Sequence, residues 1–159
     1  MMKFPRSTSS VYANPAPKQV SAALALVLAL VMVGGCAQER IDTPRARELA
    51  ALRYPETAER GPELDVLVHI EGREVHLVNR TPRSYHGMQL WLNRQYVREV
   101  QTVDIGEGNY YFLRSFINRW QEPFPTGGFL TPERRRPLVL AELYDPQADV
   151  RYPLQTQPE

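Results

Sequence analysis

Hydrophobic and polar residues alternate along the chain from Leu64 onward. Leu64, Val66, Val68 and Ile70 alternate with Asp65, Leu67, His69 and Glu71. A period of two is typical of a β-strand that buries one face. The alternation returns at Glu74–Val78, after Glu71-Gly72-Arg73, a sequence typical of a turn. These two segments predict a β-hairpin.

Further strand-like segments follow, separated by residues that favour turns. They are Met88–Leu92, a bent or divided stretch over Tyr96–Val100 and Thr102–Ile105, then Tyr110–Ile117, Leu138–Tyr144 and Val150–Leu154. Turns are expected at Asn93-Arg94-Gln95 and at Gly106–Asn109. About seven short strands, with a turn signal about every 8–12 residues, favour an all-β protein with an antiparallel immunoglobulin-like β-sandwich over residues 63–157.

One short helix is predicted before the strands. Thr43 suits the N-cap, Pro44 suits the first helical position, and Arg45–Tyr54 contains mostly good helix formers. Leu49 and Leu52 lie three residues apart and can rest together on the domain. We interpret residues 36–62 as an N-terminal spacer that contains this helix.

An uncharged apolar run, Val20–Val33, lies near the start of the chain. The residues before it carry basic side chains and no acidic ones. The run is shorter than the roughly 20 apolar residues that a membrane-spanning helix needs, and it is typical of a signal peptide. It ends at Gly34-Gly35-Cys36, which contains the chain's only cysteine.

The sequence Val33-Gly34-Gly35-Cys36 resembles the lipobox of bacterial lipoproteins. The resemblance implies that residues 1–35 are a cleaved signal peptide and that Cys36 is the lipid-attachment site and the mature N-terminus. Because Ala37 stands where an Asp resembles an inner-membrane retention signal, the expected location is the outer membrane, facing the periplasm. Two alternatives remain: cleavage after Ala37 to give a soluble domain, or an uncleaved anchor.

The charge balance changes at Cys36. Three of the 19 Lys and Arg residues (Lys3, Arg6 and Lys18) precede it, whereas all 18 acidic residues follow it. The mature chain therefore carries 16 Arg and a formal charge of −2, against +1 for the full sequence. This balance disfavours a nucleic-acid partner. The absence of Lys after Cys36 also excludes lysine-based catalysis.

A second resemblance concerns the strands. Asn79-Arg80-Thr81, a strand pair, and then Gly106-x-Gly108 before an aromatic strand with Phe112 are similar to small immunoglobulin-like domains of bacterial envelope proteins. The sequence from Trp91 to Tyr96 resembles uncharacterised planctomycete-type lipoproteins. Such domains serve many functions, so the resemblance implies a fold and transfers no activity.

Aromatic residues are concentrated between Trp91 and Phe129. We expect Tyr110, Phe112 and Phe116 to share one buried face. Trp120, Phe124 and Phe129 fall in a stretch rich in Pro and Gly, where exposed rings could stack on a glycan or a peptide. The alternative is a loop that folds down as a lid over the open end of the sandwich.

The densest charge cluster is Arg134-Arg135-Arg136, just before a predicted strand. These guanidinium groups are candidates for contact with lipid phosphates or an acidic partner. A solvated turn that protects a strand edge is the simpler interpretation.

The three histidines raise the question of a metal site. A two-residue loop at Gly72-Arg73 would place His69 opposite His76, with His86 or Glu74 as a third ligand. A loop at Glu71-Gly72 would instead pair His69 with Glu74 and separate the imidazoles. The default interpretation is the solvent face of a hairpin, so we predict no metal and no other cofactor.

No catalytic motif follows Cys36. There is no Gly-x-Ser-x-Gly, and Ser84 and Ser115 lack a recognisable catalytic context. We therefore expect a lipid-anchored envelope protein that is not an enzyme and that contacts another envelope protein. The alternatives are a module that binds cell-wall or surface glycan and, more remotely, a hydrolase.

Overall fold

The computed structural model describes residues 40–127 and 136–157, apart from the side chain of Glu107. Its elements in chain order are α2 (Pro44–Ala51), β1 (Glu59–Arg60), β2 (Leu64–Glu71), β3 (Glu74–Asn79), β4 (Tyr85–Leu92), β5 (Tyr96–Val103), β6 (Gly106–Phe112), a 3₁₀ turn (Leu113–Ser115), β7 (Ala141–Asp145) and β8 (Val150–Thr156). Nearly every predicted strand is present, and α2 ends three residues earlier than predicted.

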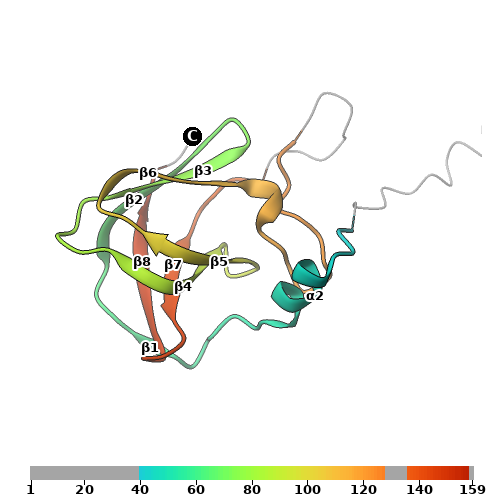
Figure 1. Ribbon diagram of the computed structural model, residues 1–159, viewed down its shortest axis with the longest axis horizontal. Helices are drawn as coiled ribbons and strands as arrows, with labels where there is room; N and C mark the ends of the chain where they lie inside the picture. The colour runs from blue at the N-terminus through green and yellow to red at the C-terminus, as the bar shows by residue number, and fades with distance from the viewer. Residues whose placement is uncertain (1–39, 128–135, 158–159) are drawn as a thin grey trace, which may run out of the picture. The chain divides into compact units, whose positions relative to one another are not determined.

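The strands form one continuous sheet in the order β5-β4-β7-β8-β2-β3-β6, with β1 paired to β8. Strand β8 makes the sheet continuous, because it is antiparallel to β7 on one side and parallel to β2 on the other. Figure 1 shows the sheet curling round a common interior. The all-β class is confirmed. The pairing describes a nearly barrel-like sheet and does not single out the immunoglobulin-like sandwich of two separate sheets.

Side chains link β5 and β6, the two end strands of this order. The Tyr111 hydroxyl on β6 donates a hydrogen bond to the backbone oxygen of Thr102 on β5, at 3.0 Å. The Asn109 side chain accepts a hydrogen bond from the backbone nitrogen of Asp104 at 2.7 Å. These contacts hold the ends of the sheet near one another.

The β2–β3 hairpin resolves the two registers that the sequence left open. Glu71 pairs with Glu74, and His69 pairs with His76. The loop is therefore Gly72-Arg73, and Gly72 has a positive φ of 58°, which a glycine adopts without steric cost.

Strand β6 corrects two expectations. The predicted turn at Gly106–Asn109 is part of the strand, where a shift in register against β3 marks a β-bulge. Gly106 and Gly108 have φ values of 85° and 111°, which suit a bulge as well as a turn. Tyr110 and Phe112 were expected in the core, but they are 59% and 65% exposed, because the bulge and the pairing with β3 set their side of the sheet.

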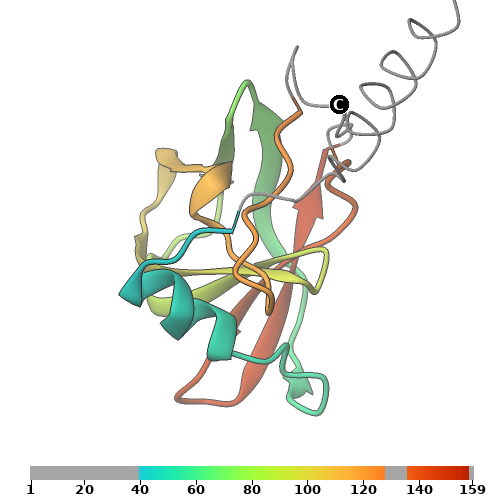
Figure 2. The same cartoon turned by 90° about the vertical axis from the view of Figure 1, so that its right-hand side faces the viewer.

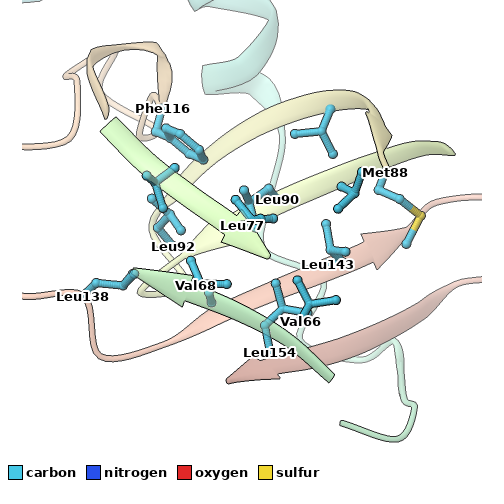
Figure 3. Packing of buried hydrophobic residues seen from close by; sticks show 14 of the residues in the cluster. Val66, Val68, Leu77, Met88, Leu90, Leu92, Phe116, Leu138, Leu143 and Leu154 are labelled. Carbon is cyan, nitrogen blue, oxygen red and sulfur yellow. The ribbon is translucent and has the colours of Figure 1, made fainter. Parts of the chain in front are cut away.

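The main core fills the inside of the curled sheet. Inward-facing residues of β2, β3, β4 and β7, including Val66, Leu77, Leu90 and Leu143, are at most 1% exposed. Figure 3 shows their side chains converging from different strands, with Phe116 at one side. Phe116 is fully buried, as predicted.

A second apolar cluster lies beneath α2, on the outer side of β4 and β5. Leu49 of the helix packs with Trp91 and Val97, and Leu52 is partly buried beside them, as predicted. Figure 2 shows the helix in front of the yellow-green strands. The segment 40–62, expected to form a spacer, therefore packs against the sheet through α2 and through β1, which pairs with β8.

Residues 1–39 lie outside the described part of the chain, so the predicted leader and Cys36 receive no structural account. Across residues 40–127 and 136–157, no helix has the length and apolar character needed to span a bilayer.

Candidate functional site

A groove of about 640 Å³ lies between the end of α2 and the β4–β5 turn. Its apolar lining comes from the second cluster: Leu49, Leu52, Trp91, Val97 and Ile117. The rim of the groove is polar, in contrast to this apolar lining. It carries the Trp120 ring and three guanidinium groups, those of Arg53, Arg94 and Arg119. This volume lies within the range of about 300–1,000 Å³ typical of ligand pockets.

One wall is built by the segment after β6. Ile117 exchanges backbone hydrogen bonds with Val97 of β5 at 3.0 and 3.1 Å. The buried Asn118 then organises a tight turn, because its side-chain oxygen accepts from the backbone nitrogens of Trp120 and Glu122 at 2.9 and 3.0 Å. This turn presents Arg119 and Trp120 at the rim.

The β4–β5 turn supplies Arg94. Asn93 and Arg94 both have positive φ values, 51° and 58°. The Asn93 side-chain oxygen accepts from the backbone nitrogens of Val139 and Leu140, at 2.9 and 3.1 Å, which anchors the turn. Arg94 then lies over the Tyr54 ring, 5.6 Å from its centroid.

Tyr54, which lines another side of the groove, forms hydrogen bonds with a buried polar group. Tyr54 donates a hydrogen bond to Glu142, which is only 3% exposed, and accepts one from Arg151 at 2.5 Å. Arg151 also lies 3.7 Å from the Glu142 carboxylate. Burial raises the pKa of Tyr54 above its ordinary value of 10.0, and the hydrogen bond to Glu142 raises it further, against the opposing effect of Arg151.

The rim of the groove is locally cationic. Among the described residues, its lining carries three arginines against one carboxylate, Glu56, although the chain after Cys36 is net negative. Arg119 lies 4.0 Å from the centroid of the Trp120 ring. Within the described residues, neither Arg94 nor Arg119 forms an ion pair. Guanidinium groups free of carboxylates can bind an anionic group from outside.

The structure separates the aromatic residues that the sequence grouped as contact candidates. Trp120 is 48% exposed and lines the groove. Phe124 is only 1% exposed and packs edge-on against Tyr96, with centroids 5.0 Å apart, so its assignment as a contact residue is corrected to a core role. Phe129 lies outside the described residues.

Of the predicted arginine cluster, the structure describes Arg136. Its guanidinium donates to the Gln95 side chain at 2.5 Å and lies 5.7 Å from the centroid of the Tyr96 ring. Gln95 lines the groove, so Arg136 stands beside the rim. Arg134 and Arg135 lie outside the described residues.

Sequence reasoning missed Tyr54, Arg94 and Arg119 as members of one site. The turn at Asn93-Arg94-Gln95 was visible in the sequence, and so was the position of Arg119 beside Trp120. Their meeting with the end of α2 depends on contacts between segments far apart in the chain.

No protein-family model, curated protein or solved structure matches this chain.

Proposed function

We propose that this chain is a lipid-anchored envelope protein with a binding role and no catalysis, and that its groove holds an acidic segment of another envelope protein. The leader and the lipobox-like Val33–Cys36 support the anchor and the outer-membrane location facing the periplasm. An immunoglobulin-like relationship is a separate proposal that rests on the sequence resemblance, and the function does not depend on it.

The observation that carries the proposal is the pairing of an apolar floor with a cationic rim. Leu52 and Tyr54, which are partly buried, offer apolar surface to an incoming side chain above the buried Leu49 and Val97. Arg94 and Arg119 offer donors for carboxylates. Alternating acidic and apolar side chains on one extended segment satisfy both requirements. Arginine suits this role because its planar fork binds a carboxylate through two hydrogen bonds.

The contacts of Trp120 favour a peptide over a glycan. Sugar rings stack on open aromatic faces, but Arg119 already lies 4.0 Å from the centroid of the Trp120 ring. A sugar stacking on the same face would have to displace this guanidinium. The exposure of Trp120, which is 48%, supports the alternative of a glycan ligand. Glycan binding is therefore one outcome that the test below distinguishes.

Photo-crosslinking in cells tests the proposal. A photoreactive residue replaces Thr57, an exposed residue of the groove lining, and the matched control carries it at the exposed Gln101, outside this groove. Photochemistry is needed because the chain after Cys36 offers no lysine to amine-reactive reagents. We expect one dominant protein adduct from position 57 and none from position 101.

Charge reversal then tests the chemistry of the rim. Arg94→Glu and Arg119→Glu should each reduce the adduct at least about tenfold, which corresponds to about 1.4 kcal/mol. Arg60→Glu, an exposed change on β1 outside the groove lining, should leave the adduct unchanged. Adducts to glycan alone, or a protein adduct that survives both reversals, would contradict the proposal.

A further inference from the structure

The outer face of the β2–β3 hairpin brings two imidazoles together. His69 and His76 are directly opposite in the register, and both belong to the set of residues that points away from the core. Their rings are stacked, with centroids 5.3 Å apart and planes inclined by 24°. The Tyr110 ring of β6 lies on the far side of His76, at 5.9 Å.

Carboxylates lie beside this pair. Glu71 and Glu74 form the next pair on the same face, next to the loop. The His76 Nε2 atom is 3.5 Å from a Glu74 carboxylate oxygen and 4.0 Å from one of Glu71. One donor atom each from His69, Glu71 and His76 lies within 4.8 Å of the others. Two imidazoles and a carboxylate are therefore grouped on adjacent strands.

A second observation concerns His69 alone. Its Nδ1 atom is buried and has no hydrogen-bond partner among the described residues. A buried polar atom without a partner costs free energy, and a bound ion or an ordered water is a common reason for it. Nothing in the hairpin itself supplies that partner.

We propose that His69, Glu71 and His76 form a binding site for a divalent transition-metal ion, with zinc as its best fit. Neutral imidazole and carboxylate are donors that zinc accepts, and two histidines with one glutamate form a known ligand set. Mg²⁺ and Ca²⁺ prefer sites made of oxygen alone, so the two imidazoles disfavour them. This site shares no residue with the groove and does not depend on the proposed function.

The geometry requires only a small adjustment. Donor atoms about 2.0–2.1 Å from a tetrahedral zinc ion are roughly 3.3 Å from one another. In the structure, the three donor atoms lie within 4.8 Å of one another. The Glu71 side chain is 75% exposed and free to change rotamer, whereas His76, at 29%, is held between its neighbours. Three protein ligands leave a fourth position for water, for Glu74 or for a donor from another molecule.

Zinc titration of the full-length chain tests the site. The chain is purified in detergent without a histidine tag, and free zinc is followed by competition with a chromophoric chelator. We expect one zinc ion per chain and a melting temperature that rises with zinc, because binding to the folded state alone stabilises it. Mg²⁺ at the same concentration should cause no rise.

Variants assign the ligands. His69→Gln, His76→Gln and Glu71→Gln should each weaken zinc binding at least about tenfold. His86→Gln, an exposed histidine of β4 outside the cluster, should bind zinc as the wild-type chain does. Circular dichroism without metal identifies any variant that fails to fold. In that case the paramagnetically shifted imidazole N–H signals in the proton NMR spectrum of the Co²⁺-bound wild-type chain report imidazole ligation directly. Absence of zinc binding, or undiminished binding by the histidine variants, would overturn the proposal.

Discussion

At the scale of single residues, a buried polar group connects the groove to the sheet. Glu142 on β7 is 3% exposed, and the Tyr54 hydroxyl and Arg151 satisfy its charge. Arg151 also donates to the backbone oxygens of Glu56 and Ala58, at 3.2 and 3.3 Å, so it ties the connector after α2 to β8. Removing one member of such a group leaves a buried charge without its partner, which is strongly destabilising.

The raised pKa of Tyr54 predicts a loss of stability at alkaline pH. Burial is the first cause, and a raised pKa means that the folded state holds the phenolic proton more tightly than the unfolded state does. This contribution to stability is fully present at pH values below the pKa that Tyr54 has in the unfolded chain. It is lost as the pH rises through the higher pKa that Tyr54 has in the folded protein. The pKa values of Tyr111 and Tyr144 are raised as well, so these residues also make the folded state less stable as the pH rises.

Urea unfolding between about pH 8 and about pH 11 measures this effect. We expect the free energy of unfolding to fall across this range, and to fall less steeply in Tyr54→Phe. Tyr110→Phe, which alters a 59% exposed side chain, should keep the wild-type slope. An identical slope in Tyr54→Phe and the wild-type chain would contradict this assignment.

At the scale of elements, α2 belongs to the folded domain. Its start follows local rules: the Thr43 hydroxyl accepts from the Ala46 backbone nitrogen at 3.1 Å, and Pro44 occupies the first turn. Eight residues are too few for a stable isolated helix, so packing must supply the rest. That packing comes from Leu49, Ala46 and Ala50 on the second cluster, where all three are buried.

Leu49→Ala should therefore destabilise the protein by about 2–5 kcal/mol, as expected for a buried leucine that leaves a cavity. The same substitution in a spacer that did not touch the domain would leave the free energy of unfolding almost unchanged. Val139→Ala is the matched control, because Val139 is 69% exposed and surface changes usually stay within about 0.5 kcal/mol. Equal urea midpoints for the two variants would show that α2 does not stabilise the domain.

At the scale of the whole molecule, the folded domain and the proposed lipid anchor rest on different interactions. The domain is held by an apolar core inside the curled sheet. The proposed lipid anchor would depend on one sulfur atom, that of Cys36. Each buried methylene of an acyl chain contributes about 0.8 kcal/mol, and stable attachment needs more than one chain.

Cys36→Ser should move the protein out of the membrane fraction, because a serine hydroxyl does not replace the thiol in diacylglyceryl transfer. Gly34→Ala, which keeps a small residue in the lipobox-like sequence, should leave the protein in the membrane fraction. Fractionation and the mass of the N-terminal peptide measure the two outcomes. A wild-type chain whose N-terminal peptide still carries residues 1–35, with no lipid on Cys36, would support an uncleaved anchor instead.

Much of the secondary structure could be predicted because it depends on local order. Alternation from Leu64 predicted β2 and β3, and Thr43-Pro44 predicted the start of α2. Prediction was weaker at β6, where Gly106 and Gly108 favour a turn and a bulge equally well. Only pairing with β3 decided for the bulge, and it left Tyr110 and Phe112 on the outer face.

The sequence by itself thus determined the all-β class, most strand positions and the helix start, because alternation and capping act over a few residues. It also carries the predictions of the leader and of Cys36. Only the tertiary structure decided that β8 joins β7 to β2 in one sheet, that His69 faces His76, and that the arginines of the groove lie on one rim. Register and long-range packing depend on the free energy of the whole fold, and no short segment contains that information.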